Sequence, residues 1–182
     1  MGLSELPTEL IYMIADVLDS QHAINAFART DRALFARLNP YLYRYHVKHS
    51  VPSSALMWAA ERGDSELLKR LLSAGVDIYN PYEWDNLDTG FKFCHLGYDH
   101  PIIEASYSGH VEFVETMLDT GMIDKLSKID RRFLSLTAIW GKRENVVDML
   151  FRRGLTSSTY AECTARPKFR KRRRSTRYQD SM

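Results

Sequence analysis

The chain has 182 residues, 45% hydrophobic and 26% charged, with a formal net charge of +2, a composition typical of a globular protein. The longest apolar run, residues 55–60, is too short for a transmembrane helix, and the first twenty residues are too acidic for a signal peptide. The two cysteines, Cys94 and Cys163, form no disulfide framework. We therefore expect an intracellular protein without a membrane partner, located in the cytoplasm, the nucleus or both.

The first fifty residues predict three short helices. The first carries apolar residues at every fourth position around Pro7, the pattern of an amphipathic helix: Leu6, Leu10, Ile14 and Leu18. A second short helix is expected around Ile24, and a third is expected to end at Asn39–Pro40. Because so small a core is marginal alone, we expect this unit to need a partner or the segments that follow it.

Three later segments can be laid over one another, and each ends in a glycine: Gly75, Gly121 and Gly154. The last two glycines are 33 residues apart and the first two are 46 apart, so an insertion of thirteen residues separates the first two segments. A period of 33 residues is the ankyrin spacing. The segments resemble ankyrin repeats, most closely from His100 to Val114.

The third repeat can be aligned in two ways. Gly63 and Gly109 suit the left-handed residue that ends the first helix of repeats one and two. Alignment on Gly154 places Lys142 at that position, whereas the other alignment places Gly141 there and requires one extra residue before the second helix. Both alignments remain open at this point.

Candidate target-binding residues follow from the ankyrin pattern, in which the two residues before the first-helix glycine face the concave surface. They are Glu61-Arg62, Tyr107-Ser108, and either Trp140-Gly141 or Ile139-Trp140. The insertion at 79–99 is rich in aromatic residues: Tyr79, Tyr82, Trp84, Phe91, Phe93 and Tyr98. These rings either cover the gap between repeats or form a recognition patch. The predicted target-binding residues are Glu61, Arg62, Trp84, Tyr107 and Trp140.

The C-terminal segment, residues 156–182, is basic and poor in aliphatic residues, so we predict that it is disordered. A nuclear import signal is one interpretation of its densest cluster: Lys168, Arg170, Lys171, Arg172, Arg173 and Arg174. A solvated tail, an unspecific phosphate-binding arm and a misassigned exon are the others. The remaining residues carry a net charge of about −4, so we expect no specific nucleic-acid partner.

No motif predicts an enzyme, a cofactor or a metal site. The histidine pair His46 and His49, and the pair Cys94-His95 near His100, lack a second pair at zinc-site spacing, so solvated or capping histidines are favoured. Gly141-Lys142 lacks the earlier glycine and the following hydroxyl residue of a phosphate-binding loop. Motifs of nucleophilic or metal-dependent hydrolysis are also missing from the sequence.

The segment from Leu6 to Asp19 resembles the opening of an F-box, and the resemblance continues through four later residues: Ile24, Phe27, Arg32 and Phe35. That family more often carries Cys-Arg and Trp where Asp31-Arg32 and Phe35 stand here. The stretch from Asn39 to Ala60 resembles the junction between F-box and ankyrin repeats that is common in filamentous fungi. The resemblance implies that Leu6, Pro7, Leu10, Ile14 and Leu18 bind the Skp-type adaptor of a cullin ubiquitin ligase.

The predicted fold is all-α: an F-box-like unit of three helices at 1–50, about three ankyrin repeats at 51–155, and a disordered basic tail at 156–182. The predicted function is that of a substrate-recruiting subunit of a cullin-type ubiquitin ligase, which binds an unknown protein target through its repeats. The alternative is a nuclear ankyrin scaffold or transcription coregulator whose N-terminal helices only cover the end of the repeats.

Overall fold

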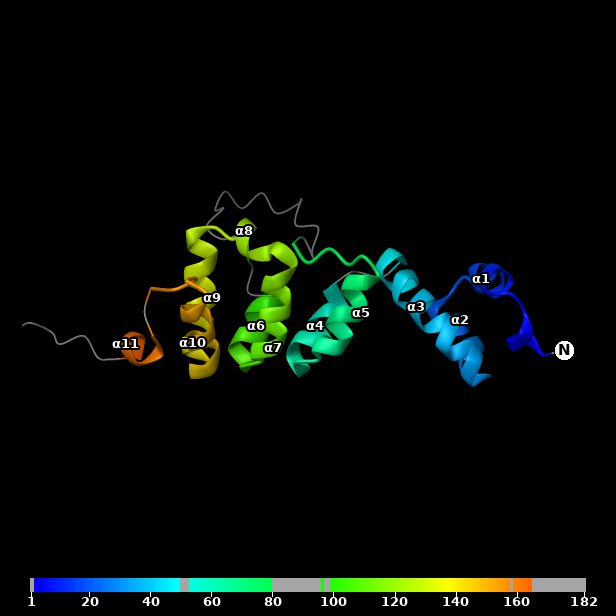
Figure 1. The fold of residues 1–182 in the computed structure, drawn as a ribbon, viewed down its shortest axis with the longest axis horizontal. Helices are drawn as coiled ribbons and strands as arrows, with labels where there is room; N and C mark the ends of the chain where they lie inside the picture. Colours follow the sequence, from blue (N-terminus) through cyan, green and yellow to red (C-terminus); the bar gives the residue numbers. More distant parts are fainter. Residues whose placement is uncertain (1, 50–52, 80–95, 97–98, 158, 165–182) are drawn as a thin grey trace, which may run out of the picture.

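The computed structural model describes residues 2–49, 53–79, 96, 99–157 and 159–164. Its helices follow one another along an elongated rod that has the N-terminus at one end (Figure 1). The part of the chain described in these ranges contains helices and loops but no strand, in agreement with the all-α prediction. None of its helices combines the length and the apolar character that a membrane span requires.

The N-terminal unit is built from one short 3-10 helix and three α-helices: η1 (Leu3–Glu5), α1 (Thr8–Val17), α2 (Gln21–Ala28) and α3 (Arg32–His49). Its core consists of seven buried apolar side chains: Ile11, Ala15, Ile24, Ala28, Leu34, Leu38 and Leu42. Ser20 begins α2 by accepting a hydrogen bond from the Ala23 N–H at 3.1 Å, as a helix cap does.

The inner face of α1 differs from the predicted stripe. Ile11 and Ala15 are fully buried, whereas Leu10 is 44% exposed. The reason is geometric, because a spacing of four residues exceeds the 3.6-residue helical turn and winds around the helix. Within the stripe, Leu18 therefore packs against the core, while Leu10 points outward. Leu6 also packs against the core, but it precedes α1 and has an extended backbone.

The predicted end of the third helix at Asn39–Pro40 is wrong. Helix α3 continues through Pro40 to His49. Proline inside a helix removes one backbone hydrogen bond at a cost of about 3 kcal/mol, but the residues beyond it gain contacts on two sides. Leu42 is buried in the N-terminal core, and Tyr43 and Val47 pack against the core of the repeats. Helix α3 therefore joins the two units.

The repeats form three helix pairs: α4 (Ser53–Arg62) with α5 (Ser65–Ser73), α6 (Pro101–Ser108) with α7 (Val111–Met117), and α9 (Lys128–Trp140) with α10 (Glu144–Arg152). The first helices α4, α6 and α9 contact one another in that order, and α5, α7 and α10 form a second layer. Two short helical segments, η2 (Leu118–Met122) and α8 (Ile123–Lys125), connect the second pair to the third. One continuous core lies between the layers.

The structure decides the register of the third repeat. Gly63 and Gly109 end the first helices of repeats one and two with φ of 66° and 90°, and Lys142 occupies the same position with φ of 57°. Gly141 has an ordinary helical φ of −71°. The alignment on Gly154 is therefore correct, and the alternative centred on Gly141 is wrong. Gly141 is required for another reason, since a β-carbon there would overlap the carbonyl oxygen of Tyr107.

The boundary of the predicted tail lies further along the chain than residue 156. Residues Tyr160–Thr164 form α11, which contacts α9 and α10. Tyr160 is half-buried against the core of the repeats. Helix α11 therefore packs on the repeats, which the composition of the segment did not predict. The rest of the predicted tail, 165–182, lies outside the described residues.

Candidate functional site

Three large aromatic residues are exposed on the first helices of the repeats: Trp58 on α4, Tyr107 on α6 and Trp140 on α9. Each is about half exposed, at 45–55%. Tyr107 and Trp140 occupy the same position in consecutive repeats, two residues before the left-handed residue. Exposed aromatic side chains that recur on neighbouring helices are typical of a protein-binding surface. We call these three residues the aromatic row.

Neighbouring side chains hold two members of the aromatic row in place. The Arg62 guanidinium lies 4.4 Å from the centroid of the Trp58 ring, a cation–π contact within one helix. The Trp140 ring meets the edge of Phe133 at a centroid distance of 6.5 Å and an angle of 81°. Both rings therefore have a fixed neighbour on one side and remain accessible on another.

A hydrogen bond repeated between successive repeats fixes the backbone beneath this surface. His110 Nε2 donates to the carbonyl oxygen of Glu61 at 3.0 Å, and Arg143 Nε donates to the carbonyl oxygen of Tyr107 at 3.0 Å. Each donor side chain occupies the space that a β-carbon would need at Gly63 or Gly109. The exposed side chains are thus held at a constant spacing by the next repeat.

The structure brings together most of the predicted target-binding residues. Glu61, Arg62, Tyr107 and Trp140 are all exposed and lie on the first-helix layer. Trp84 lies outside the described residues. The sequence reasoning missed Trp58, because it considered only the two positions before each glycine. The signal that could have revealed Trp58 is its place one helical turn before Arg62, which puts both on one face of α4.

The aromatic insertion begins with a residue that covers the gap between repeats. Tyr79 is half-buried, and its hydroxyl donates to the carbonyl oxygen of Thr120 at 3.2 Å. Lys125 Nζ lies 3.5 Å from the centroid of the same ring. Ile78 and Leu96, before and after most of the insertion, are buried in the core. At Tyr79 the covering interpretation is therefore correct, and five further rings lie outside the described residues: Tyr82, Trp84, Phe91, Phe93 and Tyr98.

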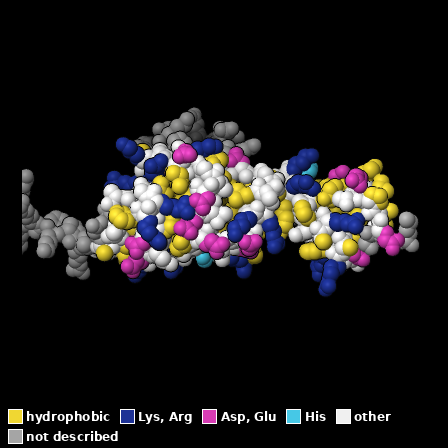
Figure 2. All heavy atoms as spheres, viewed as in Figure 1, with side chains coloured by type: hydrophobic (Ala, Val, Ile, Leu, Met, Phe, Trp, Pro, Cys, Tyr) yellow, Lys and Arg dark blue, Asp and Glu magenta, His cyan; other side chains and the backbone are white. Residues whose placement is uncertain are grey.

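A second exposed apolar surface lies on the N-terminal unit. We call it the N-terminal apolar face, and its members are Leu3, Leu10, Met13 and Val17. Met13 is 62% and Val17 79% exposed, an unusual degree for apolar residues on one helix face. Hydrophobic side chains gather at this end of the molecule, over α1 (Figure 2). Nothing else in the described residues covers this face.

The predicted adaptor-binding residues divide between this face and the N-terminal core. Pro7 and Leu10 are exposed, and Ile14 is half-buried. Leu6 and Leu18 pack against the core instead. Leu3, Met13 and Val17 were not predicted, although the helical spacing of Met13 and Val17 relative to Leu10 places these three on the same side of α1.

The buried histidine of the repeats has a structural role. His100 caps α6, with Nδ1 accepting from the Ile102 N–H at 3.2 Å and Nε2 donating to the Ile78 carbonyl oxygen at 3.0 Å. Burial lowers the pKa of His100 to about 4, so the ring is neutral at pH 7. His100 is therefore a capping histidine, as one of the two favoured interpretations predicted. Within the described part of the chain, no group of three or more His, Cys, Asp or Glu side chains could hold a metal ion.

The comparisons with known proteins agree with the geometry of the repeats. A family model described as ankyrin repeats in three copies matches residues 56–159. No curated protein and no solved structure matches the chain. Three copies agree with the three helix pairs, with the left-handed residue at the end of each first helix, and with the bond that ties each repeat to the next. The chain belongs to the ankyrin-repeat family.

Proposed function

We propose that this chain is a substrate-recruiting subunit of a cullin-type ubiquitin ligase, whose N-terminal helices bind a Skp-type adaptor and whose aromatic row binds a protein target. Ankyrin repeats are protein-interaction modules, and the target-binding half of the proposal rests on that property. The chain itself carries out no chemistry. Its contribution is proximity, because it holds a target lysine near the charged ubiquitin-conjugating enzyme.

The observation that carries the proposal is the presence of two exposed apolar surfaces on one rod. The N-terminal apolar face lies on α1, and the aromatic row lies on α4, α6 and α9. Helix α3 packs against both cores and so separates the two surfaces along the rod, as Figure 1 shows. A protein that binds an adaptor at one end and a target at the other needs two such surfaces.

The adaptor contact is tested by a double substitution on α1. Leu10→Asp with Met13→Asp places two charges on the N-terminal apolar face and should abolish binding of a purified Skp-type adaptor, because a buried unpaired charge is costly. The core residues Ile11 and Ala15 are left intact. The matched control is Ile129→Asp with Phe151→Asp, which puts the same charges on exposed apolar residues of the repeats. Adaptor binding at the wild-type level by the α1 variant would refute the adaptor half of the proposal.

The target contact is tested by affinity purification from cells followed by substitution in the aromatic row. Trp58→Ala and Trp140→Ala should each lose the target that the wild-type chain recovers, with little change in melting temperature, because both rings are half exposed. Recovery of the adaptor and the cullin should persist in both variants. A target that is retained by both variants would place recognition elsewhere on the chain.

A nuclear ankyrin scaffold or transcription coregulator is the second candidate, and one observation favours it. Tyr43 and Val47 of α3 cover the first repeat, which is what a terminal cap does in a repeat protein. Recovery of a transcription factor without adaptor or cullin would support this candidate. Deletion of 166–182, which removes the proposed import residues, should then move a reporter fusion from the nucleus to the cytoplasm. An unchanged distribution would remove the proposed import signal.

A further inference from the structure

A groove lies at the junction between the N-terminal unit and the first ankyrin repeat. It consists of two adjoining hollows of about 580 and 330 Å³ that share Asn39 and Tyr43 of α3. The larger hollow is lined from α2, α3 and α4, and the smaller one from α3 and α5. We call the two together the junction groove. It is separate from both surfaces described above.

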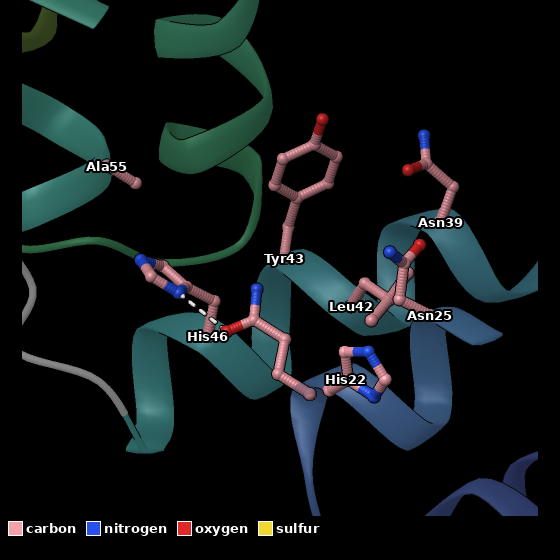
Figure 3. Close-up of a pocket in the computed structure, with 8 residues that line it drawn as sticks. His22, Asn25, Asn39, Leu42, Tyr43, His46 and Ala55 are labelled. Atoms are coloured by element: carbon pink, nitrogen blue, oxygen red, sulfur yellow. Dashed lines mark hydrogen bonds between the residues drawn. The ribbon is translucent and has the colours of Figure 1, made fainter. Parts of the chain in front are cut away.

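The larger hollow has an uncharged lining whose surface is mostly apolar but which carries several polar side chains. Figure 3 shows Asn25 of α2 and Asn39 of α3 near one another, with His22 beside Asn25 and His46 at the opposite side of the hollow, toward Ala55. Gln21 adds a third carboxamide, and its Oε1 lies 3.1 Å from His46 Nδ1. Burial lowers the pKa of His46, so its ring stays neutral at pH 7. Carboxamides both donate and accept hydrogen bonds, as does a peptide main chain.

The smaller hollow is cationic. Arg44 and Arg70 line it, and no carboxylate is among its described lining residues. Tyr43 lines the same hollow, and its side chain raises the pKa of Arg70. Arg44 lies 5.7 Å from the centroid of the Tyr12 ring. Because a tyrosine lies beside each arginine, less side-chain entropy is lost when an anion binds.

The acidic residue one turn before Arg70 is already paired. Glu66 on α5 accepts a hydrogen bond from Lys69 Nζ at 2.8 Å. No carboxylate lines the smaller hollow, but Arg44 also lines a second hollow together with Asp16 and Asp19. Planar guanidinium groups recognise carboxylates through paired hydrogen bonds.

We propose that the junction groove binds a short acidic peptide segment. The main chain of the peptide bonds with the carboxamides of Asn25 and Asn39, and an Asp or Glu carboxylate enters the smaller hollow between Arg44 and Arg70. The positive charge of the smaller hollow selects this occupant over a basic segment. Because residues from both units line the groove, the bound peptide contacts the N-terminal helices and α5 at once.

Binding is tested on the full chain with a labelled peptide. The probe is fluorescein-labelled Ala-Glu-Ala-Glu-Ala with a C-terminal amide, and the control peptide has Gln at both Glu positions. Fluorescence anisotropy should show the Glu peptide binding at least about tenfold more tightly, as expected for charge-assisted hydrogen bonds. The difference should shrink as NaCl is raised, because salt screens exposed charges. Equal affinity for the two peptides would overturn the proposal.

Variants then locate the site. Arg70→Gln should weaken the Glu peptide about tenfold, whereas Arg152→Gln, the same change on the exposed face of α10, should leave the affinity unchanged. Asn25→Asp, at an exposed position of α2, should weaken binding by repulsion and keeps the test valid if Arg70→Gln unfolds. In NMR spectra, the side-chain amide signals of Asn25 and Asn39 should shift with the Glu peptide. Equal weakening by Arg152→Gln, or unmoved amide signals, would show that binding is unspecific or lies elsewhere.

Discussion

The N-terminal unit and the ankyrin repeats are both made of short helices, but they are held together in different ways. In the repeats one contact recurs. His110 of repeat two donates to the carbonyl oxygen of Glu61 in repeat one, and Arg143 of repeat three donates to the carbonyl oxygen of Tyr107 in repeat two. In the N-terminal unit each contact occurs once. Arg37 donates to the Leu6 carbonyl oxygen at 2.9 Å, and Tyr41 donates to Asp16. Recurring contacts leave a periodic sequence pattern, whereas single contacts do not.

This difference explains where a family can be detected. The family match begins at residue 56 and covers the repeats, whose positions reinforce one another over three copies. The N-terminal unit has a core of seven buried apolar residues, against 24 in the core of the repeats, counted over the described residues. A small core constrains fewer positions, so many sequences can build it. The comparison predicts that the two units also differ in stability.

The largest expected effects come from core truncation in each unit. Phe113→Ala, at a fully buried site in the middle repeat, should lower the free energy of unfolding by about 3–5 kcal/mol. Ile24→Ala, at a fully buried site in the smaller core, should cost about 2–5 kcal/mol. Urea unfolding with hydrogen exchange should show that Ile24→Ala exposes the amides of α1 and α2 first. Simultaneous loss of protection in the repeats would mean that α3 couples the two units into one cooperative fold.

The second prediction concerns the pH dependence that His100 gives to the repeats. His100 titrates near pH 4 in the folded chain and near 6.5 when unfolded, so the unfolded state binds the proton first as the pH falls. Stability from this group is fully present above pH 6.5 and should fall by about 3 kcal/mol toward pH 4. His100→Thr keeps a capping side chain but cannot titrate. The variant should be less stable at pH 7, and its deficit should shrink toward pH 4.5 in thermal melts. A constant deficit would contradict the assigned titration.

The third prediction separates two reasons for glycine in the repeats. Gly141→Ala should cost about 1–3 kcal/mol, because the β-carbon meets the Tyr107 carbonyl oxygen of the neighbouring repeat. Gly75→Ala should cost about 1 kcal/mol, since φ is 89° there but nothing lies within 4 Å of the added carbon. Thermal melts of the two variants measure both costs. A larger effect at Gly75 would show that backbone strain outweighs the contact between repeats.

The smallest expected effect comes from an exposed ion pair between repeats two and three. Arg153 lies 2.5 Å from Asp119 and 3.7 Å from Glu115, and the carboxylates are largely exposed. Arg153→Gln should therefore lower stability by only about 0.2–1 kcal/mol, and less at high salt. Arg152→Gln, one residue earlier on α10, is the control. A loss above 2 kcal/mol would mean that charge pairing contributes substantially to the contact between repeats.

Several features could be predicted from the sequence because local physics decides them. The 33-residue period and the terminal glycines predicted three repeats, and a family match to three repeats confirms them. Glu61, Arg62, Tyr107 and Trp140 were placed on the exposed first-helix layer by the same period.

Other features depended on contacts between residues far apart in the chain. The local pair Asn39–Pro40 indicates the end of a helix. Helix α3 nevertheless continues, because Leu42 packs in the N-terminal core and Tyr43 and Val47 pack against the core of the repeats. Trp58 was missed because its exposure depends on what the neighbouring helices leave uncovered.

The sequence by itself therefore determined the all-helical class, the repeat number and the exposed positions of the first helices, since periodicity and turn chemistry act over a few residues. Only the tertiary structure decided the register of repeat three, where Lys142 takes the left-handed position with φ of 57°. Gly141 has a helical conformation, and the absence of a β-carbon there lets the Tyr107 carbonyl oxygen approach closely. The tertiary structure also decided which side of α1 is buried, because that depends on how α2 and α3 close over it.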